Sequence, residues 1–305
     1  MKFIKSKKFK ELKRQSISYL FIAPAVLVFV IFVFIPMFGS LYWSFTEYNV
    51  LESPQWVGLS NYKTILFDDP RFWKAMSNTF IYVLGTVPTG ITLALTAAIC
   101  IDQKIKFKNF FKTSFFLPSV TSVVAISVIW KWLYAGGKYG LLNHFLSKIG
   151  IEPVDWLMSV KWTLPSIMMM SIWGGLGYNM ILFLAGLQGI PKTYYDAADV
   201  DGANVWGKFW HVTMPFLRPT LLFVTIMSFI SSFQVFEQVY IMTGGSEGAV
   251  GGVLDCALTI VAYLYEMGFD NWKMGYASAL AYMIFACLFV ITLINLKLTE
   301  SKVDL

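Results

Sequence analysis

Charged side chains are scarce in this sequence. Asp, Glu, Lys and Arg together make up 14% of the 305 residues, whereas a soluble domain carries about 25%. Cysteine is also rare, and the spacings of Cys100, Cys256 and Cys287 form neither a disulfide framework nor a metal site, so we interpret all three as apolar packing. These shortages argue against a soluble protein and against a disulfide-stapled one.

Hydrophobic residues are correspondingly abundant, at 57%, and the mean hydropathy is +0.62. Six charge-free runs are each long enough for a membrane-spanning helix, which needs roughly 17–25 apolar residues. The sequence therefore predicts an all-α polytopic membrane protein with a single transmembrane domain over residues 1–305. Its six predicted spans cover about 16–43, 76–100, 113–134, 163–187, 219–241 and 274–297.

The first of these runs has some features of a signal peptide, because it follows a basic start and contains Ala23-Pro24-Ala25. A signal peptide has an apolar core of only about 7–15 residues, with the cleavage site after it. Here the apolar run continues beyond Ala25 as far as Pro36. We therefore expect the segment to be retained as a membrane anchor.

Lys and Arg are distributed unevenly between the two predicted faces. Six spans place both termini on one side, and that side collects 16 of the 24 basic residues, in the two tails, in the 102–112 loop and between 188 and 218. Because basic loops remain in the cytoplasm, we predict that both termini and the 188–218 loop are cytoplasmic. The basic excess then indicates topology and contact with anionic lipid. Nucleic-acid binding is not indicated, because the sequence has no stripe of basic residues interleaved with aromatic ones.

The segments predicted on the outer face are 47–74, 135–161 and 242–273. In the last of them, Cys256–Tyr265 is apolar but too short to span, so it is expected to form an interfacial or re-entrant helix against the bundle. The glycine-rich stretch Gly244–Gly248 lacks the Lys-Ser or Lys-Thr of a phosphate-binding loop and is interpreted as a flexible connector.

The sequence contains no convincing catalytic constellation. His144 and His211 lie on opposite predicted faces. Asp196, Asp199 and Asp201 cluster without a His or Cys to complete a metal site, and we interpret them as solvated acids at a helix end. We therefore expect no catalytic, cofactor-binding or metal-binding residue, and no enzyme activity. The chain also lacks a Walker A motif, so any ATP hydrolysis would belong to a separate subunit.

A polar island, Tyr194–Pro219, interrupts the apolar sequence between the fourth and fifth runs. Pro191 suits the first turn of a helix, Asp201-Gly202 is a helix stop, and Asn204 can cap a second helix that is expected to end before Pro215. The small residues of this helix–Gly–helix element would fit closely into a groove of another protein. The alternative is a linker that contacts nothing.

The island also carries a family resemblance. The motifs Leu184-Ala185-Gly186-Leu187-Gln188-Gly189-Ile190-Pro191, Tyr195-Asp196-Ala197-Ala198, Asp201-Gly202-Ala203, Phe209 and Met214-Pro215 resemble the EAA loop of the membrane (permease) subunits of binding-protein-dependent ABC importers. Asp196 stands where that family has glutamate. Further motifs resemble the sugar-importer branch, the relatives of the maltose and glycerol-3-phosphate permeases: Phe21–Ala25, Gly58–Tyr62, Phe72–Ala75, Asn78-Thr79 and Thr243–Gly245.

This resemblance implies a bacterial cytoplasmic-membrane permease that works in an assembly. Its expected partners are a second homologous permease, a homodimeric or heterodimeric ABC ATPase that holds ATP and Mg, an extracellular solute-binding protein and membrane lipid. The loop 188–218 would provide the coupling helix seated in the ATPase. The residues carried over to that role are Asp196, Ala197, Ala198, Asp201, Gly202, Ala203, Phe209 and Pro215.

Polar residues within the predicted spans are candidates for the substrate path, since such residues tend to face a water-filled path or a partner helix. Ser228, Ser231, Gln234 and Gln238 share one face of the fifth span at 100° per residue. Tyr178 and Asn179 lie near the middle of the fourth run. We predict that Tyr178, Asn179, Ser231, Gln234 and Gln238 line the path. Alternatively, these groups bond neighbouring helices or the partner permease.

Three other functions deserve comparison with a sugar or oligosaccharide importer. A secondary transporter would need its own ion-coupling site, and Glu237 is the only acid within a predicted span. A membrane-embedded enzyme would need paired acids or histidines. A permease for glycerol-phosphate-type or other small solutes is the third alternative, and the excess of 11 acidic over 8 basic residues in the outer segments disfavours an anionic substrate.

Overall fold

In the computed structural model, the described residues are 19–103, 105–137, 140–244 and 250–300. The chain divides into two compact units, Met1–Thr64 with Met267–Tyr282, and Ile65–Glu266 with Met283–Leu305. Each unit is described by itself. The single transmembrane domain over 1–305 remains a prediction, and the glycine-rich residues 245–249 lie outside the described part of the chain.

The smaller unit begins with a helix over Tyr19–Ser44, which comprises a π-helical turn, η1 (Val30–Phe34), and α2 (Ile35–Ser44). Strands β1 (Thr46–Glu47) and β2 (Gln55–Trp56) then pair antiparallel, and α3 (Ser60–Lys63) follows. The side-chain amide of Asn61 donates to the carbonyl oxygens of Ser44 and Thr46 at 3.0 and 2.9 Å. Residues 19–38 are exposed on every side of the first helix, which suits contact with lipid rather than water.

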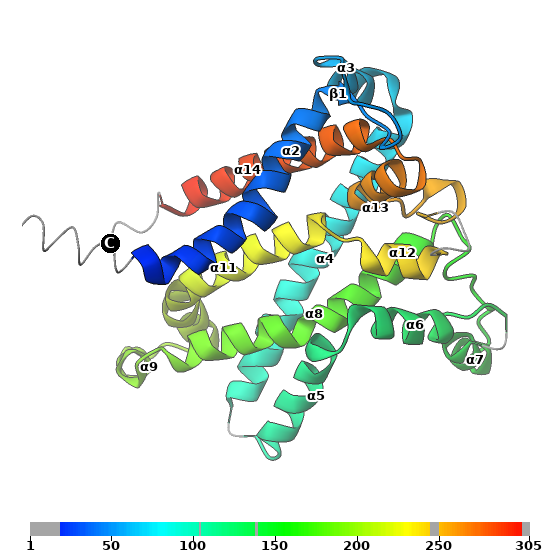
Figure 1. The fold of residues 1–305 in the computed structure, drawn as a ribbon. Helices are drawn as coiled ribbons and strands as arrows, with labels where there is room; N and C mark the ends of the chain where they lie inside the picture. Colours follow the sequence, from blue (N-terminus) through cyan, green and yellow to red (C-terminus); the bar gives the residue numbers. More distant parts are fainter. Residues whose placement is uncertain (1–18, 104, 138–139, 245–249, 301–305) are drawn as a thin grey trace, which may run out of the picture. The chain divides into compact units, whose positions relative to one another are not determined.

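The larger unit is an assembly of helices (Figure 1). Its longest helices are α4 (Pro70–Asp102), α8 (Thr163–Gln188) and α11 (Met214–Phe233). Shorter helices precede, connect or follow them. These are η2 (Thr64–Asp68), α5 (Lys108–Val120), α6 (Val123–Leu133), α7 (Leu141–Lys148), α9 (Lys192–Val200), α10 (Val205–Lys208), η3 (Phe209–Thr213), α12 (Glu237–Thr243), η5 (Val253–Asp255) and α13 (Ile260–Tyr265). The elements η6 (Glu266–Asp270) and α14 (Met274–Glu300) belong in part to each unit.

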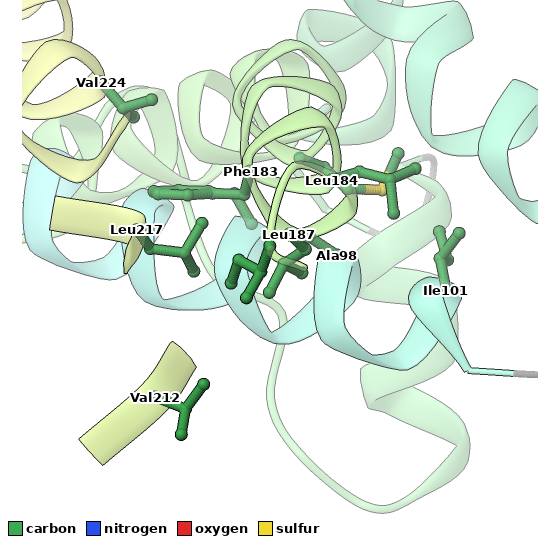
Figure 2. Packing of buried hydrophobic residues seen from close by; sticks show 11 residues of the cluster. Ala98, Ile101, Phe183, Leu184, Leu187, Val212, Leu217 and Val224 are labelled. Atoms are coloured by element: carbon green, nitrogen blue, oxygen red, sulfur yellow. The ribbon is translucent and has the colours of Figure 1, made fainter. Parts of the chain in front are cut away.

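The main apolar core of this unit joins α4, α8 and α11. In Figure 2, side chains from the last turns of α8 meet those of α4 and α11. Its buried members are Ala94, Ala98, Ile101, Met180, Phe183, Leu184, Leu187, Ile190, Val212, Leu217 and Val224. Close approach of α5 to α8 depends on Gly177, where an added Cβ would lie 2.0 Å from the carbonyl oxygen of Phe115.

Two proline residues are each preceded by a π-helical turn. The turn Val30–Phe34 comes before Pro36, and the turn Phe209–Thr213 comes before Pro215. Proline has no N–H and its ring clashes with the carbonyl of residue i−4. A widened turn accommodates the proline without ending the helix. The prediction that the second helix of the island ends before Pro215 is therefore wrong, because the helix continues from Val205 to Phe233.

Among the described residues, five helices are long and apolar enough to cross a membrane, or six if the bent pair α5–α6 counts as one span. These two helices meet at 100°, so the third span predicted over 113–134 is not one continuous helix, and whether the bent pair crosses the membrane stays a prediction. The fifth span is also interrupted, since α11 ends at Phe233 and α12 begins at Glu237. The described helices Tyr19–Ser44, Pro70–Asp102, Thr163–Gln188 and Met274–Ile294 contain most of the other four predicted spans.

Candidate functional site

The 188–218 loop has a well-defined hydrogen-bonded turn at its centre. The helix α9 ends with Gly202 in the left-handed conformation, at φ +75°. The amide of Ala203 donates to the carbonyl of Ala198 at 2.9 Å, and the amide of Gly202 to that of Asp199 at 3.1 Å. This pair of bonds is the Schellman motif, which needs a left-handed residue. The predicted stop at Asp201-Gly202 is therefore confirmed, although α9 begins at Lys192, one residue after Pro191.

The second half of the loop starts at a side-chain cap. The Asn204 side chain accepts a hydrogen bond from the amide of Gly207 at 2.8 Å, as predicted. Two side-chain contacts then join α9 to the following helix. The hydroxyl oxygens of Tyr195 and Thr213 lie 3.0 Å apart, and the ammonium group of Lys208 pairs with the carboxylate of Asp199. The two arms of the loop are thereby fastened together.

The residues carried over from the family motif occupy both sides of this element. Ala198, Ala203 and Phe209 are half-buried, and Ala198 packs against the main core. The exposed members are Asp196, Ala197, Asp201, Gly202 and Pro215. Large apolar side chains beside them also face outward, with exposed fractions of 89% for Val200, 82% for Val205 and 71% for Trp206. An exposed apolar surface on a rigid turn is typical of a protein contact.

This loop lies at the same end of the larger unit as the end of α4. The main core brings together Ile101 at the end of α4, Leu187 at the end of α8 and Val212 before α11. At the opposite end of α8, the hydroxyl of Tyr134 donates to the carbonyl of Ser166 at 3.0 Å. Figure 1 shows α9 at one end of α8 and α7 at the other. The predicted grouping of basic loops on one face is compatible with this arrangement.

A cavity of about 400 Å³ lies among α4, α8, α11 and the two helix breaks. Four of the five residues predicted for the substrate path line it: Tyr178, Asn179, Ser231 and Gln238. Gln234 is absent from the lining. It is exposed and lies directly after the last residue of α11, so the prediction that it lies on a continuous 219–241 helix is wrong.

Several polar groups of the cavity were not predicted from the sequence. They are Tyr82, Thr86, Ser119, Thr121, Ser171 and Ser232. Each lies within or beside a charge-free run, which was the available signal. Every one of the lining residues is uncharged.

Some of these polar groups also pair with one another. The amide of Asn179 donates to the hydroxyl of Ser228 at 3.4 Å, and the hydroxyl of Thr86 donates to that of Ser232 at 3.4 Å. Both bonds are long, and such bonds exchange readily for bonds to a ligand or to water. Bonding between neighbouring helices, the alternative drawn from the sequence, therefore accounts for part of the lining.

The structure describes most of the segments predicted on the outer face, with gaps at 138–139 and 245–249. Across the described residues, no three His, Cys, Asp or Glu side chains come together in a way that could hold a metal ion. The segment Cys256–Tyr265 is mostly buried and packs against α4, as expected for a segment lying against the bundle. Whether it is interfacial or re-entrant stays a prediction. Only Ile260–Tyr265 of it is α-helical.

The long apolar helices define a polytopic helical membrane protein, with an uncharged cavity beside the helix breaks. Residues 70–301 match the family described as "Binding-protein-dependent transport system inner membrane component". The chain is 36% identical to the arabinooligosaccharides transport system permease protein of Bacillus subtilis (strain 168) over 290 residues, which cover 94% of this chain and 90% of that protein. It is also 36% identical over 290 residues to the lactose transport system permease protein of Rhizobium radiobacter, covering 93% of this chain and 94% of that one.

The fold is similar to that of a solved permease chain. The match is to a bacterial ABC transporter involved in the import of the acidic polysaccharide alginate, with a TM-score of 0.81, 24% identity, and coverage of 98% of this chain and 100% of that one. The protein described here belongs to the binding-protein-dependent transport system inner membrane component family. It is a transporter permease, as the family motifs in its sequence predicted.

Proposed function

We propose that this chain is a permease subunit of an ATP-driven importer of neutral sugars or oligosaccharides. It would form the translocation path together with a second, homologous permease. Two kinds of support combine here: the relatives are permeases named for arabino-oligosaccharides and lactose, and the cavity has the chemistry that such solutes need.

The uncharged lining of the cavity is the observation that carries the proposal. Sugars present hydroxyl groups, which hydrogen-bond to amides and hydroxyls such as those of Asn179, Gln238 and Ser231. Their C–H faces pack on aromatic rings, and Tyr82 and Tyr178 supply two. A phosphate or carboxylate would enter this space without a cationic partner, at a large desolvation cost. This favours a neutral sugar over the glycerol-phosphate-type alternative.

The same lining disfavours a secondary transporter. Such a protein carries its own ion-coupling group, usually an acid near the path. Glu237, the one acid within a predicted span, is exposed and does not line the cavity.

For the energy source we propose a separate ABC ATPase that holds ATP and Mg. Its contact on this chain would be the 188–218 loop, through the exposed Val200, Val205 and Trp206 and the turn at Gly202. A cleft on the ATPase that closes on ATP would move α9 and the helix fastened to it. ATP must bind the two states of the assembly with different affinity, because equal affinity would shift no population. An extracellular solute-binding protein would deliver the sugar from the opposite face, with both termini in the cytoplasm.

The test is uptake by right-side-out membrane vesicles prepared from cells that express the full assembly, with and without this chain. Radiolabelled lactose and arabino-oligosaccharides represent neutral substrates, and glycerol 3-phosphate and a uronate oligosaccharide represent anionic ones. We expect chain-dependent uptake of a neutral sugar that needs enclosed ATP and survives a protonophore. Uptake of only the anionic solutes would contradict the substrate class. If the protonophore abolished uptake while the enclosed ATP concentration stayed unchanged, the proposal that ATP drives transport would be contradicted.

A further inference from the structure

The segment from Cys256 to Tyr265 is buried, although it lies outside the long helices. Residues Cys256–Ile260 are each 5% exposed or less. Backbone groups buried in this way need hydrogen-bond partners. These partners belong to two other elements, α4 and the break between α11 and α12. The segment therefore connects these two elements.

The first of these elements is α4. The side-chain amide of Asn78 donates to the carbonyls of Asp255 and Leu258, at 2.8 and 3.0 Å. One residue further along, the hydroxyl of Thr79 accepts from the amide of Ile260 at 2.9 Å. Asn78 and Thr79 are 4% and 0% exposed. The segment is therefore bonded directly to one turn of α4.

Ionic contacts fasten the two ends of the segment to the start of α4. The guanidinium group of Arg71 pairs with Asp255 at 2.9 Å and with Glu266 at 2.8 Å. The hydroxyl of Tyr263 donates to Asp69 at 2.6 Å. Asp69 also caps α4 by accepting from the amides of Arg71 and Phe72. The segment is thus held along its length and has little freedom to shift relative to α4.

The second element is the break between α11 and α12. The backbone leaves helical geometry at Phe236, with φ −139° and ψ −61°. In an unbroken helix the carbonyl of Val235 would accept from the amide four residues later. Here it accepts from the hydroxyl of Thr259 at 3.0 Å, with Thr259 0% and Val235 3% exposed. The hydroxyl of Thr259 replaces a helix hydrogen bond.

This bond acts next to the cavity. Val235 is itself a lining residue, and Gln238 lies one turn further on. On the facing side, Tyr82 and Thr86 of α4 line the cavity one and two turns beyond Thr79. Adjacent residues, Thr259 and Ile260, therefore tie the break in the fifth span to α4 at the outer end of the cavity.

We propose that Thr259 is a positioning residue for the transport path. The buried segment Cys256–Tyr265 acts as a fixed brace on α4, and the Thr259 hydroxyl holds the α11–α12 break against it. The brace thereby sets where Val235 and Gln238 stand in the cavity. The inference uses the proposed function only in taking the cavity as the path.

Hydrogen exchange followed by mass spectrometry tests the proposal, on the full-length chain purified in lipid nanodiscs with the subunits that co-purify. Thr259→Val keeps the side-chain shape and removes the hydroxyl. We expect amides within 234–240 to exchange about tenfold faster, as loss of one buried hydrogen bond would cause. Amides of 260–265 should change less, because Ile260 keeps its bond to Thr79. Thr259→Ser retains the hydroxyl and should restore slow exchange at 234–240.

Thr96→Val is the matched control, because the Thr96 hydroxyl bonds only within α4, to the carbonyl of Thr92 at 2.8 Å. This variant should leave the exchange rates of the amides in 234–240 unchanged. The proposal would be overturned if the amides of 234–240 exchange at the wild-type rate in Thr259→Val. It would also be overturned if they exchange as fast in Thr259→Ser as in Thr259→Val. If Thr259→Val fails to assemble, Thr259→Cys provides a weaker donor. The amides of 234–240 should then exchange faster in Thr259→Cys than in Thr259→Ser, and the reverse order would overturn the proposal. The readout needs neither sugar nor ATP, so its failure is distinct from failure of the proposed function.

Discussion

The hydroxyl groups of Tyr195 and Thr213 lie 3.0 Å apart and join α9 to the helix that runs on as α11. Thr213 is 7% exposed, and the ring of Tyr195 packs against the main core. In the proposed coupling, a displacement of α9 would therefore be passed directly to a helix that lines the cavity. The contact gives the proposed coupling a specific physical route.

Replacing Tyr195 with Phe should weaken that route. The change removes one hydrogen bond, worth about 0.5–1.5 kcal/mol, and keeps the ring in the core. We expect ATP hydrolysis stimulated by the binding protein to persist while the amount of sugar imported per ATP falls. Both quantities are measured on the same proteoliposomes.

Tyr194→Phe is the control, since Tyr194 instead packs its ring on Phe216 at 4.6 Å. It should keep the wild-type ratio of sugar to ATP. An unchanged ratio in Tyr195→Phe would rule out the contact as a coupling route.

Gly202 tests the turn itself. Its φ is +75°, and an added Cβ would meet nothing within 4 Å in this chain, so within the chain the effect of substitution comes from the backbone. Valine in a left-handed conformation costs on the order of 1–2 kcal/mol, whereas asparagine adopts it more readily. We expect Gly202→Val to insert in the membrane and lose most transport, and Gly202→Asn to retain most of it. Equal impairment of the two variants in the uptake assay would contradict this explanation.

The cavity predicts a difference between two nearby glutamines. Gln238 lines the cavity and Gln234 does not. Gln238→Leu should lose a hydrogen bond of about 0.5–1.5 kcal/mol, which is roughly a twofold to tenfold rise in the sugar concentration for half-maximal uptake. Gln234→Leu should leave that concentration unchanged. The opposite ranking would mean that the path runs elsewhere.

These two glutamines also mark the limit of sequence reasoning here. Apolar run length was enough to place most of the long helices, and small residues with a left-handed glycine were enough to predict the turn at Gly202. The break after Phe233 was missed because Val235 and Phe236 look like any apolar helix residues. At the break, the carbonyl of Val235 accepts instead from the hydroxyl of Thr259, a residue distant in sequence.

For a similar reason, only part of the cavity lining could be predicted from the sequence. Polar residues in apolar runs pointed to Tyr178, Asn179, Ser231 and Gln238. Tyr82 lies in another run and Ser171 in the same run as Tyr178, and neither carries a distinguishing pattern. Which helices face one another decides whether such groups meet, and that information comes from packing, such as the glycine contact at Gly177.

Gly177 supplies a stability prediction. A Cβ there would lie 2.0 Å from the backbone oxygen of Phe115, whereas one at Gly174 in the same helix would meet nothing within 4 Å. Gly177→Ala should therefore force α5 away from α8, at a cost of about 1–3 kcal/mol. The midpoint of thermal unfolding in detergent should fall for Gly177→Ala and stay near wild type for Gly174→Ala. Equal midpoints would show that the close approach is not needed.

The orientation of the 188–218 loop is the most direct test of the whole account, because an ATPase can contact the loop only in the cytoplasm. Val200 is 89% exposed and Leu254 is 81% exposed in this chain, so in cells that lack the proposed ATPase a cysteine at either position should react once reagent reaches it. Intact cells bearing Val200→Cys or Leu254→Cys are treated with a membrane-impermeant maleimide, and the wild-type chain gives the background from its native cysteines. We predict labelling of Leu254→Cys in intact cells, and of Val200→Cys only after permeabilisation. Labelling of Val200→Cys in intact cells would place the loop outside and contradict the proposed coupling to an ATPase.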